Sequence, residues 1–285
     1  MSYFYIDEGK VYSFGDGESN QLGYQAHGGV GTPRLIEALN GVKVRQIVSG
    51  ALHNLAIDEQ GRVYGWGSGN YAQHGQSVVD AVIEPQLISS LSDRPIAFAS
   101  AGLYHSVVVT KSQEVLFFGG HKTKTLGANL HRTQFFLAPT PVKDLSPLPG
   151  EQWTHLTSGI THNVITSNMG RTFAWGTNTG FSVGSDTARF DQAIQLHELD
   201  GKVLATLASG SYHNMASDAE GRIWAWGQGS DYQLGTLRRS QEHPTHVPLD
   251  LPSPSKVVQI AAGWAHTLLL VELSPIASHA HAMHL

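Results

Sequence analysis

Short stretches of alternating apolar and polar residues, bounded by Gly, Asp and Pro, run along the whole chain. Residues 63–66 alternate with a period of two, which is typical of a half-buried β-strand. One unit of the pattern predicts strands at 44–48, 53–57 and 62–66, with a weaker one at 86–91. No segment has a sustained apolar period of 3.6 residues, so the pattern predicts an all-β fold.

These strands belong to a unit that repeats. Gly50, His53, Gly67 and Gly75 mark one copy, with offsets of three, fourteen and eight residues. The same frame starts again at Gly102, Gly159 and Gly210. The glycines that end the third strands lie 51–57 residues apart, and a four-stranded repeat of this length is typical of a propeller blade.

The two ends of the chain carry incomplete copies. The first copy has only its back half, ending in Gly15 and Gly23, and the last has only its front half, with strands at 257–260 and 267–272. We therefore expect a β-propeller of about five, or six, four-stranded blades over residues 1–273, closed by N- and C-terminal strands.

Residues 274–285 show no strand pattern, and we expect a flexible tail that contains His279, His281 and His284. The spacing of these histidines suits a transition metal, but no carboxylate accompanies them, so we predict no metal site.

Composition limits the other classes of function. The formal net charge of −5 gives no electrostatic reason to bind nucleic acid or an anionic membrane. The absence of Cys excludes disulfides and thiolate chemistry. The first residues do not resemble a secretory signal, and the longest apolar run, 268–271, is too short to span a bilayer. We expect an intracellular protein, cytoplasmic or nuclear, that is a monomer.

The repeated histidines suggest either a metal ring, a proton relay or a structural role. They are His53, His105, His162, His213 and His266. Because one stands in every repeat, we favour hydrogen bonds to backbone groups within or between blades. The aromatic slot that ends each third strand holds Trp66, Trp175 and Trp226, with Phe14 and Phe118 in the other copies. These side chains are expected to fill the space between sheets rather than to form a ligand cage.

No catalytic constellation accompanies the repeats. The Gly-rich fragments after the Trp-Gly elements lack a following helix, so phosphate-loop interpretations fail. No Ser-His-Asp order or carboxylate pair stands out, so we expect neither an enzyme nor a cofactor.

Departures from the repeat point instead to partner binding. The loops after the Trp-Gly element are expected on one rim, where basic residues gather in the middle and last copies: Lys122, Lys124, Arg132, Arg238 and Arg239. Such a rim can steer a protein partner, although loops also carry charge for solvation alone. Phe135 and Phe136 are either an exposed anchor or part of an outer strand.

The repeat resembles the regulator of chromosome condensation repeat family. The resemblance rests on Ser-Gly-Ser-Tyr-His-Asn at 209–214, Gly-Arg-Ile-Trp-Ala-Trp-Gly at 221–227 and Tyr-Gln-Leu-Gly at 232–235, and it covers nearly all of residues 1–273. It implies a β-propeller, usually with seven blades, that binds proteins. We therefore expect an interaction scaffold whose partner is a protein such as a small GTPase. The alternative that the resemblance implies is guanine-nucleotide exchange on a Ran-like or other small GTPase.

Overall fold

The computed structural model describes residues 2–6, 9–120, 135–142, 145–185, 193–248 and 255–273. Within these ranges the strands form six antiparallel sheets, each made of strands that are consecutive in the sequence. Four sheets have four strands, the first has three and the last has two. The predicted all-β fold is confirmed, with four complete sheets between two smaller ones.

We number the sheets as blades I to VI. Blade I contains β1 (Ser2–Ile6), β2 (Lys10–Gly15) and β3 (Val30–Leu35), and blade II contains β4 (Val44–Ser49), β5 (His53–Asp58), β6 (Val63–Gly67) and β7 (Val82–Leu87). Blade III contains β8 (Ile96–Ala101), β9 (His105–Thr110), β10 (Val115–Gly119) and β11 (Phe136–Pro141), and blade IV contains β12 (Trp153–Ser158), β13 (His162–Ser167), β14 (Thr172–Gly176) and β15 (Ile194–Gln195). Blade V contains β16 (Leu204–Ser209), β17 (His213–Asp218), β18 (Ile223–Gln228) and β19 (Ser240–Val247), and blade VI contains β20 (Ser255–Ala262) and β21 (Thr267–Leu273).

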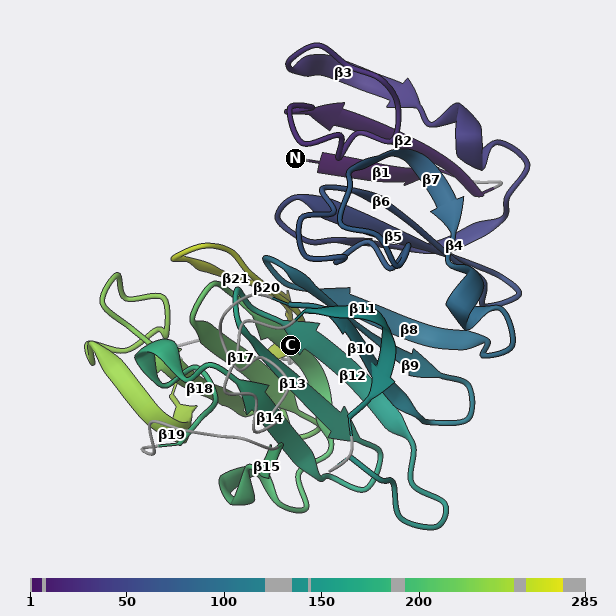
Figure 1. Ribbon diagram of the computed structural model, residues 1–285. Coiled ribbons are helices and arrows are strands. Elements are labelled where there is room, and N and C mark those ends of the chain that lie inside the picture. The colour runs from purple at the N-terminus through teal and green to yellow at the C-terminus, as the bar shows by residue number, and fades with distance from the viewer. Residues whose placement is uncertain are drawn as a thin grey trace, which may run out of the picture.

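The blades follow one another along an arc, from β1–β3 in purple to β18 and β19 in green (Figure 1). The first strands of successive blades lie next to each other, in the order β4, β8, β12, β16 and β20. These strands therefore line the inside of the arc, and the fourth strands lie outside. This is the blade arrangement of a β-propeller.

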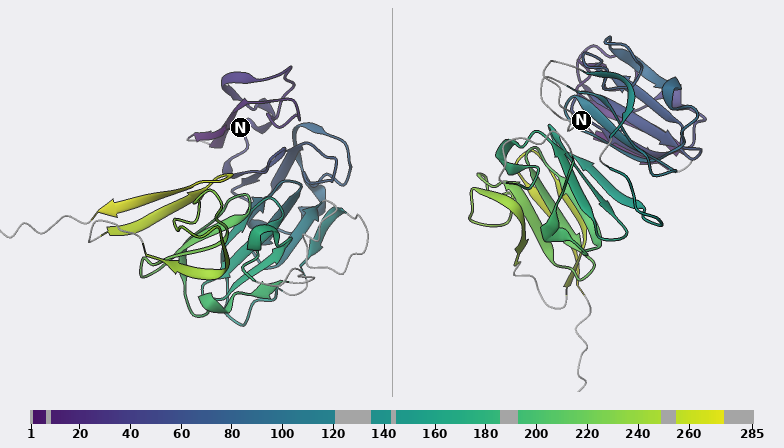
Figure 2. Two further views of the ribbon diagram at one scale, coloured as in Figure 1. Left: turned by 90° about the vertical axis from the view of Figure 1, so that its left-hand side faces the viewer. Right: turned by 60° about the horizontal axis from the view of Figure 1, so that its bottom comes forward.

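The expected closure of the ring by terminal strands stays a prediction. Among the described strands, none of β1–β3 pairs with β20 or β21, and the two ends form separate sheets. Figure 2 shows the yellow hairpin of blade VI projecting away from the N-terminal sheet.

In blades II and V, the hairpin between the second and third strands is held by one ion pair and one glycine. In blade II the buried carboxylate of Asp58 accepts the backbone N–H of Arg62 at 2.8 Å and its guanidinium Nε at 2.6 Å. Gly61 completes the turn with a φ of +88°, a conformation that favours glycine. Asp218 and Arg222 form the same pair in blade V.

The hydrophobic core is divided among the joints between neighbouring blades. The aromatic side chains that precede the conserved glycine position of the third strands are completely buried in four of these joints: Trp66, Phe118, Trp175 and Trp226. Burial of one such ring system removes roughly 200 Å² from water, which is worth about 5 kcal/mol.

The outer strand of blade II lies earlier than the sequence pattern predicts. We expected a strand at 86–91, whereas β7 ends at Leu87 and residues Ser89–Leu91 form the 3-10 helix η3. Pro85 lies inside β7, which an outer strand tolerates because its free edge needs no N–H donor. The other short helices are η2 (Glu37–Leu39), η4 (Thr179–Phe181) and η5 (His197–Leu199).

Candidate partner-binding rim

One rim of the arc carries two sets of loops. Because consecutive strands are antiparallel, the loops between first and second strands emerge at the same end of each blade as the loops between third and fourth strands. The Gly-x-x-His segments lie in the first set, and Arg238 and Arg239 lie in the second.

The repeat histidines of blades II to V bind side chains of the following blade. Their Nε2 atoms make these contacts: His53 with Ser106 Oγ at 2.7 Å, His105 with Asn163 Oδ1 at 2.8 Å, His162 with Asn214 Oδ1 at 2.9 Å and His213 with Thr267 Oγ1 at 3.0 Å. We expected backbone partners; the structure shows backbone contacts for His53 and His213, with His105 and His266, and adds a side-chain partner across the joint for all four histidines.

In three of the four joints, those with Ser106, Asn214 and Thr267, the partner side chain also reaches back to the preceding blade. Ser106 Oγ donates to Gln73 O at 2.8 Å, and Thr267 Oγ1 donates to Gln233 O at 2.8 Å. A hydroxyl that donates there must accept from the histidine, so Nε2 carries the proton. We call this arrangement, a histidine bound to a polar residue that in turn binds a loop carbonyl, the cross-blade clip.

Burial keeps these histidines neutral. It lowers the pKa of His53 to about 3, with help from the nearby His105, and it lowers the pKa of His105, His162 and His213 to about 4. Nδ1 of His162 has no hydrogen-bond partner within the described residues, so a proton added there would remain unpaired. A neutral, buried imidazole with a fixed tautomer is a structural group and a poor proton carrier at pH 7.

The glycine three residues earlier makes room for each imidazole. A Cβ added to Gly102 would lie 2.2 Å from His105 Cε1 and 2.5 Å from the carbonyl oxygen of Gly159. No side chain fits at this position without moving the joint, which explains the Gly-x-x-His spacing physically.

The fifth repeat histidine has a different environment. His266 is exposed and lines a pocket beside blade VI, whereas the other four are buried. Among the described residues, no three His, Asp or Glu side chains are close enough together to hold a metal ion.

Of the predicted basic residues, Arg238 and Arg239 are exposed in the loop between β18 and β19. The backbone of this loop is ordered by its own hydrogen bonds: Gly229 N–H donates to Arg239 O at 2.8 Å, and Gly235 N–H donates to Tyr232 O at 3.0 Å. Both arginines are thus held at the rim on a defined loop. Lys122, Lys124 and Arg132 lie outside the described residues.

The sequence allows Phe135 and Phe136 to be either an exposed anchor or part of an outer strand, and in the structure the two residues differ. Phe136 begins β11 and packs edge-on against Phe117, with ring centroids 6.1 Å apart. Phe135 precedes the strand, is 39% exposed and lies 6.5 Å from the ring of Tyr71. Phe136 is therefore a strand residue, and Phe135 is available at the surface.

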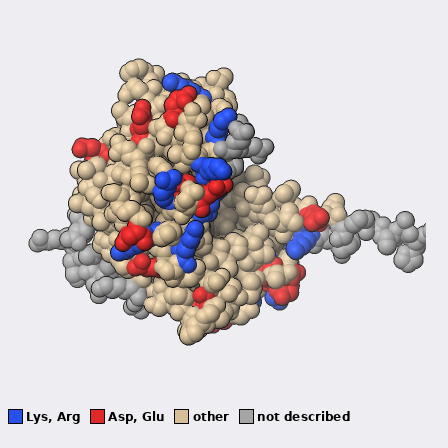
Figure 3. Space-filling view, turned by 90° about the vertical axis from the view of Figure 1, so that its right-hand side faces the viewer, with Lys and Arg blue, Asp and Glu red and all other residues tan. Residues whose placement is uncertain are grey.

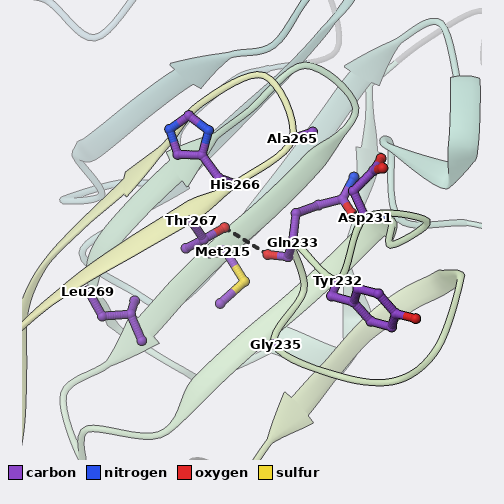
Figure 4. Close-up of a pocket in the computed structure, with 9 residues that line it drawn as sticks. All are labelled: Met215, Asp231, Tyr232, Gln233, Gly235, Ala265, His266, Thr267 and Leu269. Atoms are coloured by element: carbon purple, nitrogen blue, oxygen red, sulfur yellow. Dashed lines mark hydrogen bonds between the residues drawn. The ribbon is translucent and has the colours of Figure 1, made fainter.

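Two exposed apolar residues on this rim are not predicted from the sequence. Leu237, next to Arg238, is 91% exposed, and Trp264, in the loop between β20 and β21, is 72% exposed. Their loops flank one pocket, because Asp231 and Tyr232 line it from one side and Ala265 from the other (Figure 4). We call Leu237, Arg238, Arg239 and Trp264 the rim patch.

Charges elsewhere on the surface are mixed in sign. The face shown in Figure 3 carries Lys and Arg side chains interspersed with Asp and Glu, without a large region of one sign. Among the described residues, no helix is long and apolar enough to cross a membrane.

The consecutive four-stranded sheets and the joints that repeat along the arc define a β-propeller repeat protein. The RCC1-like domain family matches residues 1–269, and the chain belongs to that family.

Known proteins agree with this assignment. The chain is 28% identical over 265 residues to the ultraviolet-B receptor UVR8 of Arabidopsis thaliana, which corresponds to 92% of this chain and 59% of UVR8. It therefore spans about three fifths of the length of that relative. The structure of human WBSCR16 superimposes with a TM-score of 0.82 at 19% identity, covering 96% of this chain and 70% of WBSCR16. The structure of Prp20p from Saccharomyces cerevisiae superimposes with a TM-score of 0.78 at 18% identity, covering 94% of this chain and 66% of the Prp20p chain.

Proposed function

We propose that the protein is an interaction scaffold that binds a protein partner through the rim patch, and that the partner is a small GTPase. The rim patch carries this proposal. It combines two exposed apolar side chains, Leu237 and Trp264, with two exposed arginines on an ordered loop. Trp and Arg are the residues most enriched at the energetic centres of protein interfaces.

Guanine-nucleotide exchange on a small GTPase is the second candidate. Its support is membership in the RCC1-like family together with Prp20p, a protein of the same fold whose binding properties to Gsp1p and histones are described with its structure. Exchange needs no covalent chemistry from the chain. It does require tighter binding to the nucleotide-free GTPase than to the loaded one, because only a difference in affinity can shift the equilibrium.

A binding experiment on purified components tests both candidates. The chain is titrated against a panel of purified small GTPases, each loaded with GDP or freed of nucleotide, and association and dissociation rates are measured. Reversing Arg238 and Arg239 to Glu should slow association, and the effect should shrink as salt rises, since exposed charges are screened beyond about 8–10 Å. Leu237→Ser and Trp264→Ser should each raise the dissociation rate about tenfold.

The matched control is Lys111→Glu, an exposed charge in the turn between β9 and β10 on the opposite rim. It should leave both rates unchanged. If no GTPase in the panel binds, or if the control weakens binding as much as the rim substitutions, the proposal is wrong. If the chain binds loaded and empty GTPase equally and does not accelerate nucleotide release, exchange is excluded and the scaffold remains.

A further inference from the structure

The loops that lead into blades II, III and V share one turn. In each loop a 3-10 helix is followed by two exposed residues, which are Asn40-Gly41, Ser92-Asp93 and Asp200-Gly201. The backbone N–H after these two residues donates to the carbonyl oxygen of the last helix residue: Val42 to Leu39, Arg94 to Leu91 and Lys202 to Leu199, each at 3.0 Å. The repeat therefore presents the same turn with three different central dipeptides.

The three turns differ in the orientation of their central peptide. The ψ angle of the first central residue is 127° at Asn40 and 131° at Asp200, as in a type II turn, but −29° at Ser92, as in a type I turn. The second residue of a type II turn needs a positive φ, and Gly41 has a φ of +82°. Because the closing hydrogen bond is the same in both types, this loop accepts either orientation of the peptide.

In the turn of blade II, no hydrogen bond restrains the central peptide. Asn40 and Gly41 are both exposed, and neither the Asn40 side chain nor the N–H of Gly41 has a hydrogen-bond partner within the described residues. A Cβ built on Gly41 would meet no atom within 4 Å. Glycine adopts positive and negative φ with similar ease, so the peptide between the two residues can rotate.

The equivalent peptide of blade V is held in place. The N–H of Gly201 donates to Gly170 O in the hairpin of blade IV at 3.1 Å. The Asp200 carboxylate accepts from Gln195 Nε2 at 2.7 Å and from His197 Nδ1 at 2.8 Å. Rotation of this peptide would break the bond of Gly201. The two turns therefore have the same backbone shape and differ in what restrains them.

We propose that Asn40 is a site of spontaneous deamidation that produces isoaspartate. The backbone nitrogen of Gly41 attacks Cγ of Asn40 and loses its proton to water, and the side-chain amide leaves as ammonia, which closes a five-membered succinimide. Water then opens the ring. Cleavage at the former Cγ gives Asp, and cleavage at the former main-chain carbonyl gives isoaspartate. Ring closure requires the peptide to rotate until the nitrogen faces Cγ, and the turn of blade II has this freedom.

The two products have different effects on the fold. Asp200 occupies the equivalent position in blade V, so Asp in place of Asn40 fits the turn. Isoaspartate instead adds one atom to the main chain between Leu39 and Val44, which are both buried in the joint between blades I and II. The longer main chain cannot keep both side chains in place without a rearrangement, so isoaspartate loosens this joint. The site lies on the rim opposite to the rim patch and does not depend on the proposed function.

Ageing of the purified full chain at neutral pH tests the proposal. Mass spectrometry of digested samples detects the conversion of an amide to a carboxylic acid. Isoaspartate is counted by a protein-isoaspartate methyltransferase, which transfers methyl groups to it from S-adenosylmethionine. Asn40 should convert about tenfold faster than Asn70, an exposed residue followed by Tyr71, whose N–H is bound to Gln73 Oε1. Asn40→Gln should abolish most of the methylation.

The matched structural control is Asp200→Asn, which gives the restrained turn of blade V the same Asn-Gly dipeptide. Its amide should convert about tenfold more slowly than that of Asn40 in the same sample, because Gly201 keeps its bond to Gly170. The effect on the fold is measured by thermal unfolding. The isolated isoaspartate form should melt at a lower temperature than the chain with Asn40→Asp, which should melt like the unmodified protein.

Three results would overturn the proposal. The first is conversion of Asn40 no faster than that of Asn70. The second is equal conversion at Asn40 and in the Asp200→Asn chain, since the turn of blade II then has no special freedom. The third is an isoaspartate form that melts at the same temperature as the Asn40→Asp chain. All the substituted positions are exposed, so a failure to fold would not explain any of these results.

Discussion

The four buried histidines that bind across the joints predict a strong loss of stability in mild acid. Their pKa values in the folded protein are lowered from 6.5 to about 3 for His53 and about 4 for His105, His162 and His213. The unfolded chain therefore takes up protons more readily than the folded protein below pH 6.5. The stabilisation is fully present above pH 6.5 and is lost as the pH falls towards 4.

The size of the effect follows from the shifts. A shift of one pKa unit corresponds to about 1.4 kcal/mol. At pH 5 each histidine therefore lowers the free energy of unfolding by about 2 kcal/mol relative to its value above pH 6.5. Four histidines together cost about 8 kcal/mol, which is comparable to the whole stability of a typical domain, about 5–15 kcal/mol. Where it is steepest, the plot of the free energy of unfolding against pH should have a slope of about 5 kcal/mol per pH unit. We expect the protein to unfold between pH 6 and pH 4.

The carboxylate of Glu151 affects the stability over a lower pH range than the histidines do. Hydrogen bonding and charge from Arg171 hold the pKa of Glu151 at about 2, against an ordinary value of 4.5. This stabilisation is lost only as the pH falls below 4.5. A transition above that pH therefore reports mainly on the histidines.

The measurement is urea unfolding followed by tryptophan fluorescence at several pH values from 7.5 to 5. Replacing His105 with Gln lowers the stability at pH 7 but removes one titrating group, so the slope below pH 6.5 should fall by about 1.4 kcal/mol per pH unit. His27→Gln, which changes an exposed loop histidine, should reproduce the native slope. A free energy of unfolding that stays constant between pH 7 and 5, or an unchanged slope for His105→Gln, would refute the reasoning.

Other substitutions test the joints and the rim. Trp226→Ala should cost about 3–5 kcal/mol in urea unfolding because it empties a completely buried site; a cost below about 1 kcal/mol would contradict the core described above. Gly102→Ala should cost about 1–3 kcal/mol or more, since its Cβ meets His105, and a neutral result would mean that the joint can relax. Phe135→Ala should leave the melting temperature nearly unchanged and raise the dissociation rate of a rim partner, whereas Phe136→Ala should lower the melting temperature; the reverse pattern would exchange their roles. A chain ending at Ser274 should bind its partner with the affinity of the full chain, and a large loss would give residues 275–285 a function.

Most of the strand pattern can be read from the sequence because it depends on local alternation and on turns. Gly61 and Gly221 mark the hairpin positions with positive φ, and the strands on either side lie where the alternation predicts. The outer strands are harder to place. They have one free edge and tolerate Pro85, so the alternation that identifies an inner strand is weaker there.

The candidate site could be predicted only in part. The exposed charges of Arg238 and Arg239 follow from their place in a loop. Leu237 and Trp264 could not be identified, because an apolar residue in a sequence ordinarily indicates the core, and its exposure depends on which blade covers it. The partner of each histidine likewise lies in the next blade, about 50 residues away, where spacing within one repeat gives no information.

The cross-blade clip has an evolutionary consequence. The four joints from blade II to blade VI each use the same small set of groups: a glycine, a histidine and a polar residue at the start of the next second strand. The groups that one blade contributes do not depend on which blade contributes the others. Duplication or deletion of one whole unit by recombination would leave every internal clip with a partner. Only the end joints would change, so chains in this family can differ in blade number without new interfaces having to evolve.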